Sequence, residues 1–251
     1  MNSDLPLIAP AWSAPASVQA FSSTRQGGVS ATPWDQLNLG DHVNDRPQHV
    51  AVNRQRLADY IGLPAPRFAW LNQVHGTVVV EATAQNLGQL LPADASYTRE
   101  PGVVCAILTA DCLPVVLCNY QGTIVGAAHA GWRSLCGGVL ENLITAMAEP
   151  VENLMAWLGP AIGPDQFEVG PEVRQAFINH SSQAASAFAS QGARSGHYMA
   201  DIYQLATQRL RQAGVSSIGG GGLCTVSDSQ RFYSYRRDGQ TGRMATLIAF
   251  H

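Results

Sequence analysis

The chain has 251 residues and a mass of 26.7 kDa, which fits one large domain or two small ones. Charged residues make up only 13% of it, against roughly 25% in an average protein, and this composition excludes disordered and coiled-coil classes. All 15 basic residues are arginine, and the absence of lysine excludes the Walker A loop and lysine imine chemistry. A net charge of −3 argues against nucleic acid as the main partner.

The N-terminal segment, residues 1–15, has no basic stretch ahead of an apolar run, so we expect no signal peptide. No stretch approaches the roughly 18 apolar residues of a membrane span, and we expect no membrane partner. The five cysteines are odd in number and irregularly spaced, which is typical of reduced thiols rather than of a disulfide framework. Together these features predict a cytoplasmic protein.

Three helices follow from the pattern of apolar and capping residues. Asp45 is predicted to be an N-cap before Pro47, and apolar residues then recur at helical spacing up to Ile61. A second apolar helical face runs over residues 135–147. Asp201 and Gln204 resemble a capping box, and Gly214 stands where the left-handed C-terminal cap of that third helix belongs.

Runs typical of buried strands lie at residues 103–108, 114–118, 123–128, 154–158 and 245–250. Strands and helices do not alternate strictly, so the sequence predicts an α+β protein with a mixed sheet, and no shift in composition divides residues 1–251 into domains. The glycine run 219–222 does not continue as a dinucleotide-binding motif and predicts a flexible turn. Cys105, Cys118 and Cys136 are predicted to pack in the core.

Several catalytic signatures are missing from the sequence: copper-binding H-x-H pairs, the H-E-x-x-H zinc motif, the zinc-deaminase pattern and the G-x-S-x-G elbow. What remains is three donors at predicted strand ends, His75, Cys112 and His129. Two imidazoles and one thiolate are a sensible zinc set that leaves a fourth position open for water. Their spacing leaves two other interpretations open: a metal-free cysteine nucleophile with a histidine base, and ordinary core and turn residues.

Eight segments, in order and over nearly the whole chain, resemble those of one known family. They are SSTRQGGVS (22–30), LNLG (37–40), QVHG (73–76), ADA (93–95), TADCLP (109–114), AHAGWR (128–133), WLGPAIG (157–163) and FYSYRRD (232–238). The chain is therefore similar to the YfiH family, also called the laccase-domain or polyphenol oxidase family. The glycine-rich run before Cys224 departs from the family's pattern.

The resemblance implies a four-layer α/β/β/α fold with mixed sheets, and one zinc ion bound by His75, Cys112 and His129 with a zinc-bound water as nucleophile. It also implies a purine nucleoside phosphorylase that has adenosine deaminase and methylthioadenosine phosphorylase activities. Two alternative activities come with the family: peptidoglycan-precursor editing, as an amidase on UDP-muramoyl amino acids, and a copper-dependent polyphenol oxidase (laccase). Zinc is redox-silent, so laccase chemistry would need copper, and the missing H-x-H pairs make it the least favoured activity.

Phosphorolysis requires an anion site beside the sugar. Ser23 and Arg25 lie in a glycine-containing run and are predicted to bind phosphate through a hydroxyl and a guanidinium, with a solvated surface turn as the alternative. Arg133 is predicted to face a phosphate from the first turn of a helix, or else to form a surface salt bridge. Arg236, beside Tyr235, is predicted to contact a nucleobase or an acidic sugar, with an exposed position at a strand end as the alternative.

Three more polar residues complete the predicted site. Asp111 is predicted to act in catalysis, either by supporting the zinc ligands or by orienting a ribose, with an ordinary acidic residue at a strand end as the alternative. Asn38 and Gln73 are predicted substrate contacts. A non-enzymatic alternative is a zinc-stabilised interaction protein, in which His42 would be the fourth ligand.

Overall fold

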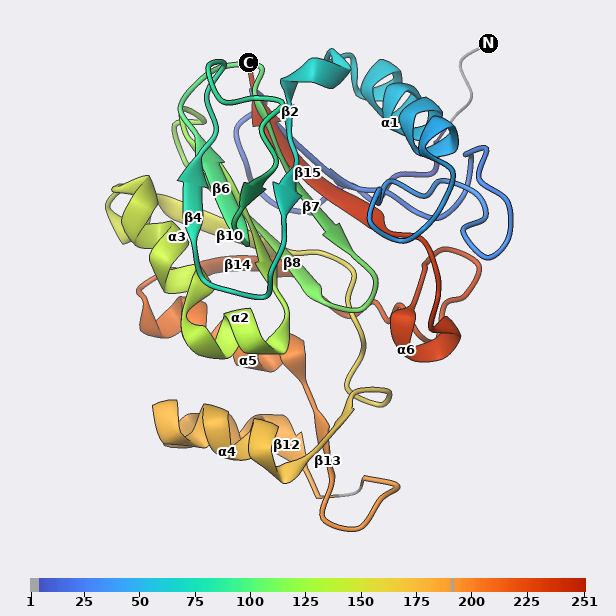
Figure 1. Ribbon diagram of the computed structural model, residues 1–251. Coiled ribbons are helices and arrows are strands. Elements are labelled where there is room, and N and C mark those ends of the chain that lie inside the picture. Colours follow the sequence, from blue (N-terminus) through green and yellow to red (C-terminus); the bar gives the residue numbers. More distant parts are fainter. Residues whose placement is uncertain (1–4, 191) are drawn as a thin grey trace.

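Two mixed β-sheets form the centre of the computed structural model, which describes residues 5–190 and 192–251 (Figure 1). The larger sheet has the strand order β14-β10-β8-β9-β6-β4. Its strands are β4 (Val79–Glu81), β6 (Ala95–Thr98), β8 (Leu113–Asn119), β9 (Val125–Ala130), β10 (Leu154–Leu158) and β14 (Ser217–Gly220). The smaller sheet has the order β1-β15-β7-β2, formed by β1 (Val18–Ser22), β2 (Phe68–Ala69), β7 (Val104–Thr109) and β15 (Met244–Phe250).

The two sheets pack face to face, and alternation along β7 shows which layer lies on each side. Cys105 and Ile107 pack in a buried cluster with residues of β8, β9 and β10 from the larger sheet. Val104, Ala106 and Leu108 point the other way, into a cluster that includes residues of α1 (Pro47–Ile61). All six residues of β7 are buried because the strand is covered on both faces.

The outer face of the larger sheet is covered by helices. In β8, Leu113, Val115 and Leu117 pack in one cluster with apolar residues of α2 (Trp132–Gly137), α3 (Val139–Met147) and α5 (Ile202–Gln212). The order of layers is therefore α1, smaller sheet, larger sheet, and α2, α3 and α5, which confirms the four-layer α/β/β/α fold (Figure 1).

Smaller elements surround this body. One three-stranded sheet consists of β11 (Glu168–Val169), β13 (Tyr198–Ala200) and β12 (Phe188–Ala189), and it lies beside α4 (Pro171–His180) at one end of the molecule (Figure 1). A two-stranded sheet joins β3 (Leu71–Asn72) to β5 (Leu91–Pro92). The 3-10 turns are η1 (Ala65–Arg67), η2 (Val151–Asn153) and η3 (Ser182–Ala187), and α6 (Tyr235–Asp238) is a single turn. Within the described residues, every helix is too short or too polar to cross a membrane.

The five predicted strands are confirmed to within two residues as β7, β8, β9, β10 and β15. Asp201 does cap α5, since its carboxylate accepts a hydrogen bond from the backbone N–H of Gln204. The amide of Gln204 bonds to Ser186 instead of returning to the cap, so only half of the capping box forms. Gly214 takes the predicted left-handed conformation, with φ +100°.

Two helix predictions were wrong in detail. The segment 135–147 is not one helix, because Gly138 takes a φ of +99° and separates α2 from α3. Asp45 is not an N-cap: Arg46 holds that position, and the Asp45 carboxylate accepts hydrogen bonds from Ser30 Oγ and Asn38 Nδ2. A buried polar cluster in the preceding loop thus takes the place of the expected cap.

The prediction for the glycine run 219–222 was wrong in part, and so was the prediction for the three core cysteines. Gly219 and Gly220 belong to β14, and only Gly221 and Gly222, both with positive φ, lie outside the strand, so the run is not a flexible turn throughout. A Cβ at Gly220 would lie 2.3 Å from the carbonyl oxygen of Leu158, which explains why glycine stands there. Cys105 and Cys118 are fully buried as predicted, whereas Cys136 is only half-buried on α2.

Candidate functional site

His75, Cys112 and His129 meet at one end of the larger sheet. His129 lies in β9, and Cys112 lies in the turn that enters β8, whose Pro114 pairs with His129. His75 lies in the connection between β3 and β4 and takes the left-handed conformation, with φ +60°. One ligand atom from each of the three residues lies within 4.8 Å of the other two.

The carboxylate of Asp94 holds both histidines in place. Asp94 precedes β6, and its Oδ1 lies 2.8 Å from His129 Nδ1 and also accepts the backbone N–H of His75 at 2.9 Å. Its Oδ2 accepts the N–H groups of Val74 and Gly76. Because Nδ1 of His129 is used in this way, Nε2 is left to face Cys112. Sequence reasoning gave Asp94 no role of its own, although it lies in the ADA segment 93–95.

Cys112, His129 and Asp94 shift one another's pKa values toward the charged forms. Burial raises the pKa of the Cys112 thiol, but the charge and hydrogen bonds of His129 and His75 outweigh it and lower that pKa to about 6. Burial lowers the pKa of His129, but Cys112 and Asp94 outweigh it and raise that pKa to about 9. The pKa of Asp94 is also lowered: burial acts against this, and the hydrogen bonds from His129 and Gly76 prevail. The thiolate is the form of Cys112 that binds a soft or borderline metal, and a bound metal would displace the extra proton of His129.

The three residues fit a metal ion with three protein ligands. Cys112 Sγ lies 4.0 Å from His75 Nε2, close to the roughly 3.5 Å between ligand atoms in a tetrahedral site with bonds of about 2.0–2.3 Å. Gly131 leaves room beside them, since a Cβ there would lie 2.9 Å from Cys112 Sγ and 3.4 Å from His75 Cδ2. The described residues can thus hold one metal ion with an open side.

Two hollows adjoin this group, and they share His75, Ala110, Cys112 and Tyr235 in their walls. The first, of about 270 Å³, is largely apolar, and its other lining residues are Asp111, Trp132, Arg133, Ile162, Phe167, Ile202 and Arg236. The second, of about 300 Å³, is more polar, and its other lining residues are His42, Gln73, Leu108, Thr109, His129 and Arg243. Tyr235, which is 63% exposed, stands between them at the start of α6.

Asp111 lines the first hollow, but its carboxylate is fully engaged by the protein. Oδ1 accepts from Thr225 Oγ1 at 2.6 Å, and Oδ2 accepts from Ser234 Oγ at 3.0 Å and from the backbone N–H of Arg236 at 2.6 Å. Asp111 has a φ of +95°, so these bonds hold a strained turn immediately before Cys112. The residue fixes the C-terminal loop and α6 against the metal group.

Three other predicted contacts line the two hollows. Arg133 and Arg236 line the first: Arg133 is exposed over the ring of Trp132, and the Arg236 guanidinium donates to the carbonyls of Gln166 and Glu168. Gln73 lines the second hollow, where its amide exchanges two hydrogen bonds with the backbone of Leu108.

His42 also lines the second hollow. It stands outside the group of three metal-binding residues, and its Nδ1 lies 3.6 Å from Asp41 Oδ1. The predicted fourth ligand thus faces the same space as the metal group without completing it.

Ser23, Arg25 and Asn38 are not brought to the two hollows. Ser23 and Asn38 are buried, and their side chains bond to backbone groups and to Asp45. Arg25 lines a separate hollow, where its guanidinium donates to the carbonyls of Asp35 and Ser229 and forms an ion pair with the Asp35 carboxylate. The phosphate site predicted in this run therefore lies apart from the metal group, and its arginine already has an anionic partner.

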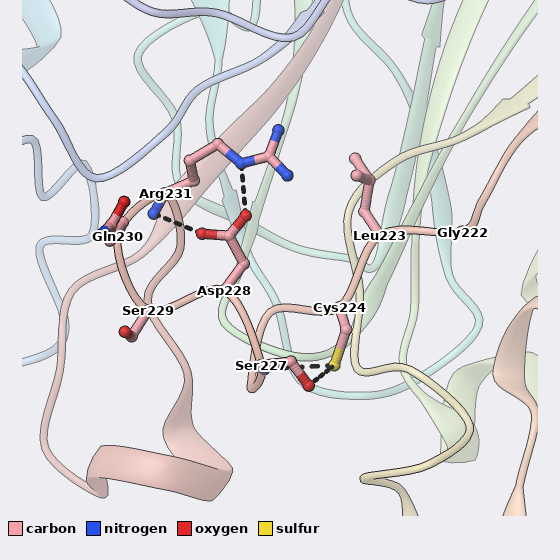
Figure 2. Close-up of a pocket in the computed structure, with 8 residues that line it drawn as sticks. All are labelled: Gly222, Leu223, Cys224, Ser227, Asp228, Ser229, Gln230 and Arg231. Carbon is pink, nitrogen blue, oxygen red and sulfur yellow. Dashed lines mark hydrogen bonds and ion pairs between the residues drawn. The ribbon is translucent and has the colours of Figure 1, made fainter.

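A further hollow has Cys224 in its wall (Figure 2). It is lined by residues 222–224 and 227–231 and shares no lining residue with the two hollows at the metal group. Cys224 Sγ accepts hydrogen bonds from Gly163 N and from both N and Oγ of Ser227. Burial raises the pKa of this thiol, but these bonds outweigh it and hold the pKa below its usual value.

Comparison with known proteins gives one consistent result. Residues 19–251 match the family model described as multi-copper polyphenol oxidoreductase laccase. The chain is 54% identical over 242 residues to purine nucleoside phosphorylase YfiH of Escherichia coli K12, covering 96% of this chain and 98% of the relative. It is 52% identical over 241 residues to a purine nucleoside phosphorylase of Pseudomonas aeruginosa, covering 96% and 97%.

Solved structures agree. A Neisseria meningitidis protein superimposes with a TM-score of 0.92 at 50% identity, over 97% of this chain and 98% of the other. YlmD from Geobacillus stearothermophilus superimposes with a TM-score of 0.89 at 31% identity, over 94% and 93%. The chain belongs to the YfiH family, whose members share the laccase-type domain matched here.

Proposed function

We propose that this protein is a purine nucleoside phosphorylase that acts at the His75–Cys112–His129 group. The observation that carries the proposal is the position of this group: His75 and Cys112 lie in the wall shared by the two hollows, and His129 lines the second of them. A reaction between two molecules, a nucleoside and phosphate, needs two adjoining spaces at one reacting centre. Relatives that are 54% and 52% identical over nearly the whole chain are named purine nucleoside phosphorylases, which supports the same substrates here.

The metal of the proposed site is zinc. Two imidazoles and a thiolate suit this borderline ion, and when bound it would act as a Lewis acid that does not change oxidation state. The protein's own part is to hold His129 in one tautomer through Asp94 and to place the aromatic walls of the first hollow against a purine. Replacing Cys112 by alanine should remove stoichiometric zinc, because only two neutral donors would remain.

Adenosine deaminase and methylthioadenosine phosphorylase activities belong to the same proposal. The first hollow, with Trp132, Ile162 and Phe167 in its wall, has apolar surface for a purine and for a methylthio group. If one metal serves both reactions, His129→Ala should abolish phosphorolysis and deamination together.

A copper-dependent polyphenol oxidase is the second candidate, and the description of the matching family model favours it. A site of two histidines and one cysteine also accepts copper, which binds more tightly than zinc in the usual affinity order. The two candidates differ in their need for phosphate and for dioxygen.

Product analysis of metal-quantified protein tests the proposal. Inosine and adenosine should yield free base and sugar-1-phosphate only when phosphate is present, and adenosine should also release ammonia without it. A UDP-muramoyl amino acid serves as the competing substrate. Cleavage of that compound alone, with no sugar-1-phosphate from either nucleoside, would contradict the proposal.

A further inference from the structure

Arg243 places a guanidinium with unused donors in the wall of the second hollow, beside Cys112 and His129. Its Nη1 donates to the carbonyls of Thr241 and Gly242, both at 3.0 Å. Within residues 5–190 and 192–251, Nε and Nη2 make no hydrogen bond, and no carboxylate oxygen lies within 4.0 Å of the guanidinium. In this it differs from Arg25, which already pairs with Asp35.

The backbone and stem of Arg243 are firmly held. Its N–H donates to Asn38 Oδ1 at 2.9 Å, and its carbonyl accepts the N–H of Leu39. The stem lies against Gly40, where a Cβ would come within 2.8 Å of Arg243 Cγ. Asn38 is itself fully buried and tied to Asp45, so the LNLG segment 37–40 forms a rigid support for this arginine.

The electrostatic setting favours an incoming anion. Burial lowers the pKa of Arg243, and the nearby Cys112 and Asp111 act in the opposite direction. A guanidinium keeps its proton in proteins, so the cation stays charged while it is partly removed from water. The carboxylate of Asp111 accepts three hydrogen bonds, from Thr225, Ser234 and the backbone of Arg236, and in the described part of the chain it forms no ion pair with Arg243. A partly desolvated cation without a carboxylate partner gains much when it binds an anion.

We infer that the second hollow binds inorganic phosphate and that Arg243 is its anchor, through the two donors left free at Nε and Nη2. His42, Gln73 and Thr109 line the same hollow and offer further polar groups. The inference rests on the proposed phosphorylase function, and it moves the phosphate from the predicted site at Arg25 to the wall of the metal group. The nucleoside then occupies the first hollow, whose lining includes the aromatic side chains of Trp132 and Phe167.

Phosphate in the second hollow and the nucleoside in the first is an arrangement that suits phosphorolysis. A phosphate oxygen forms a bond to C1′ of the sugar while the C1′–N bond to the purine breaks, and the electron pair of that bond leaves with the base. Hydrogen phosphate gives its proton to the departing base, so the products are the neutral purine and the sugar-1-phosphate dianion. The entering and leaving groups need separate spaces on either side of the sugar, which the two hollows provide.

Calorimetric titration of zinc-loaded protein with inorganic phosphate, alongside steady-state kinetics on inosine, tests the inference. Arg243→Gln should raise both the phosphate Kd and the phosphate KM at least tenfold, because a charge-assisted bidentate contact is lost. Zinc content and the KM for inosine should stay unchanged. Arg25→Gln should leave phosphate binding near wild type, and Arg99→Gln, which removes a surface partner of Glu149, is the matched control.

The outcomes separate the two proposals. If the wild-type protein forms no sugar-1-phosphate but binds phosphate, and Arg243→Gln does not bind it, the phosphorylase proposal fails and the anion site stands. If wild type is a phosphorylase and Arg243→Gln binds phosphate normally, or Arg25→Gln alone weakens it, the Arg243 site is overturned.

A measurement on wild type avoids dependence on a variant that does not fold. Phenylglyoxal labelling followed by peptide mapping should show Arg243 protected by saturating phosphate. Equal labelling of Arg243 with and without phosphate would overturn the inference in the same way.

Discussion

Asp94 Oδ1 lies 2.8 Å from Nδ1 of His129, and the same oxygen accepts the backbone N–H of His75. One buried carboxylate atom thus fixes the tautomer of one metal-binding histidine and the backbone of the other. The strained, left-handed conformation of His75 is stable because this acceptor lies where its N–H points.

Asp94→Asn should therefore weaken zinc binding by about 10–100-fold. The carboxylate accepts hydrogen bonds from His129 and from three backbone N–H groups, and an amide has only one acceptor oxygen and no negative charge. Competition with a chelator of known zinc affinity measures the change. Asp59→Asn, on the exposed face of α1, is the matched control and should bind zinc like wild type. Equal zinc affinity in Asp94→Asn and wild type would remove Asp94 from the site.

Metal-free protein should show a pH-dependent stabilisation by the Cys112–His129 pair. The pKa of Cys112, about 6, lies below its ordinary 9.0, so its contribution to stability is complete above 9.0 and lost as pH falls through 6. The pKa of His129, about 9, lies above its ordinary 6.5, so its contribution is complete below 6.5 and lost as pH rises through 9.

The Cys112 thiolate and the His129 imidazolium are charged together only between about pH 6 and pH 9, so the difference in unfolding free energy between metal-free wild type and metal-free Cys112→Ser should be largest in that range. Urea denaturation of both proteins across this range measures it, and thiolate absorbance in the ultraviolet reports the titration of Cys112 directly. A difference that does not vary with pH would show that the two groups are not an ion pair.

Gly131→Ala should reduce zinc content while leaving the fold intact. Gly131 has φ −57° and ψ 156°, which alanine adopts freely, but the added methyl would lie 2.9 Å from Cys112 Sγ. Elemental analysis and circular dichroism measure the two effects. Gly219→Ala is the control and should keep full zinc content, because its Cβ would lie 3.7 Å from the nearest atom. Full zinc content in Gly131→Ala as well would contradict a ligand role for the Cys112 thiol.

Tyr203→Phe should destabilise the protein by about 1–3 kcal/mol. The hydroxyl is buried, accepts the N–H of Ala161 at 2.7 Å and donates to the carbonyl of Leu223 at 2.7 Å, so its loss leaves both backbone groups unpaired. Chemical denaturation provides the measurement. Tyr120→Phe, at an exposed position, should unfold like wild type, and a similar result for Tyr203→Phe would mean that these hydrogen bonds contribute little.

The fold was largely predictable because its central strands are long apolar runs. Residues of β7, β8 and β9 are buried on both faces, so the runs stand out without any knowledge of their partners. The break at Gly138 was not predictable from periodicity, since apolar residues continue at helical spacing on both sides of it. Asp45 was misassigned because its buried partners, Ser30 and Asn38, are brought to it by tertiary structure.

The candidate site was predictable only where the chemistry lies in the side chain itself. His75, Cys112 and His129 could be chosen as metal donors by residue type, and the resemblance joined them into one group. Asp94 acts through a histidine that is 35 residues away, a relationship that the sequence does not encode locally. Likewise, only the structure shows that Arg25 forms an ion pair and that Arg243 forms none with the other residues it describes.

The most direct measurement compares zinc-loaded and copper-loaded protein, anaerobically and in air, on inosine with phosphate and on a phenol. The zinc form should convert inosine to free base and sugar-1-phosphate at equal rates with and without dioxygen, and it should not oxidise the phenol. Turnover by the copper form alone, on the phenol alone and only in air, would contradict nucleoside phosphorolysis at this site and establish the oxidase instead.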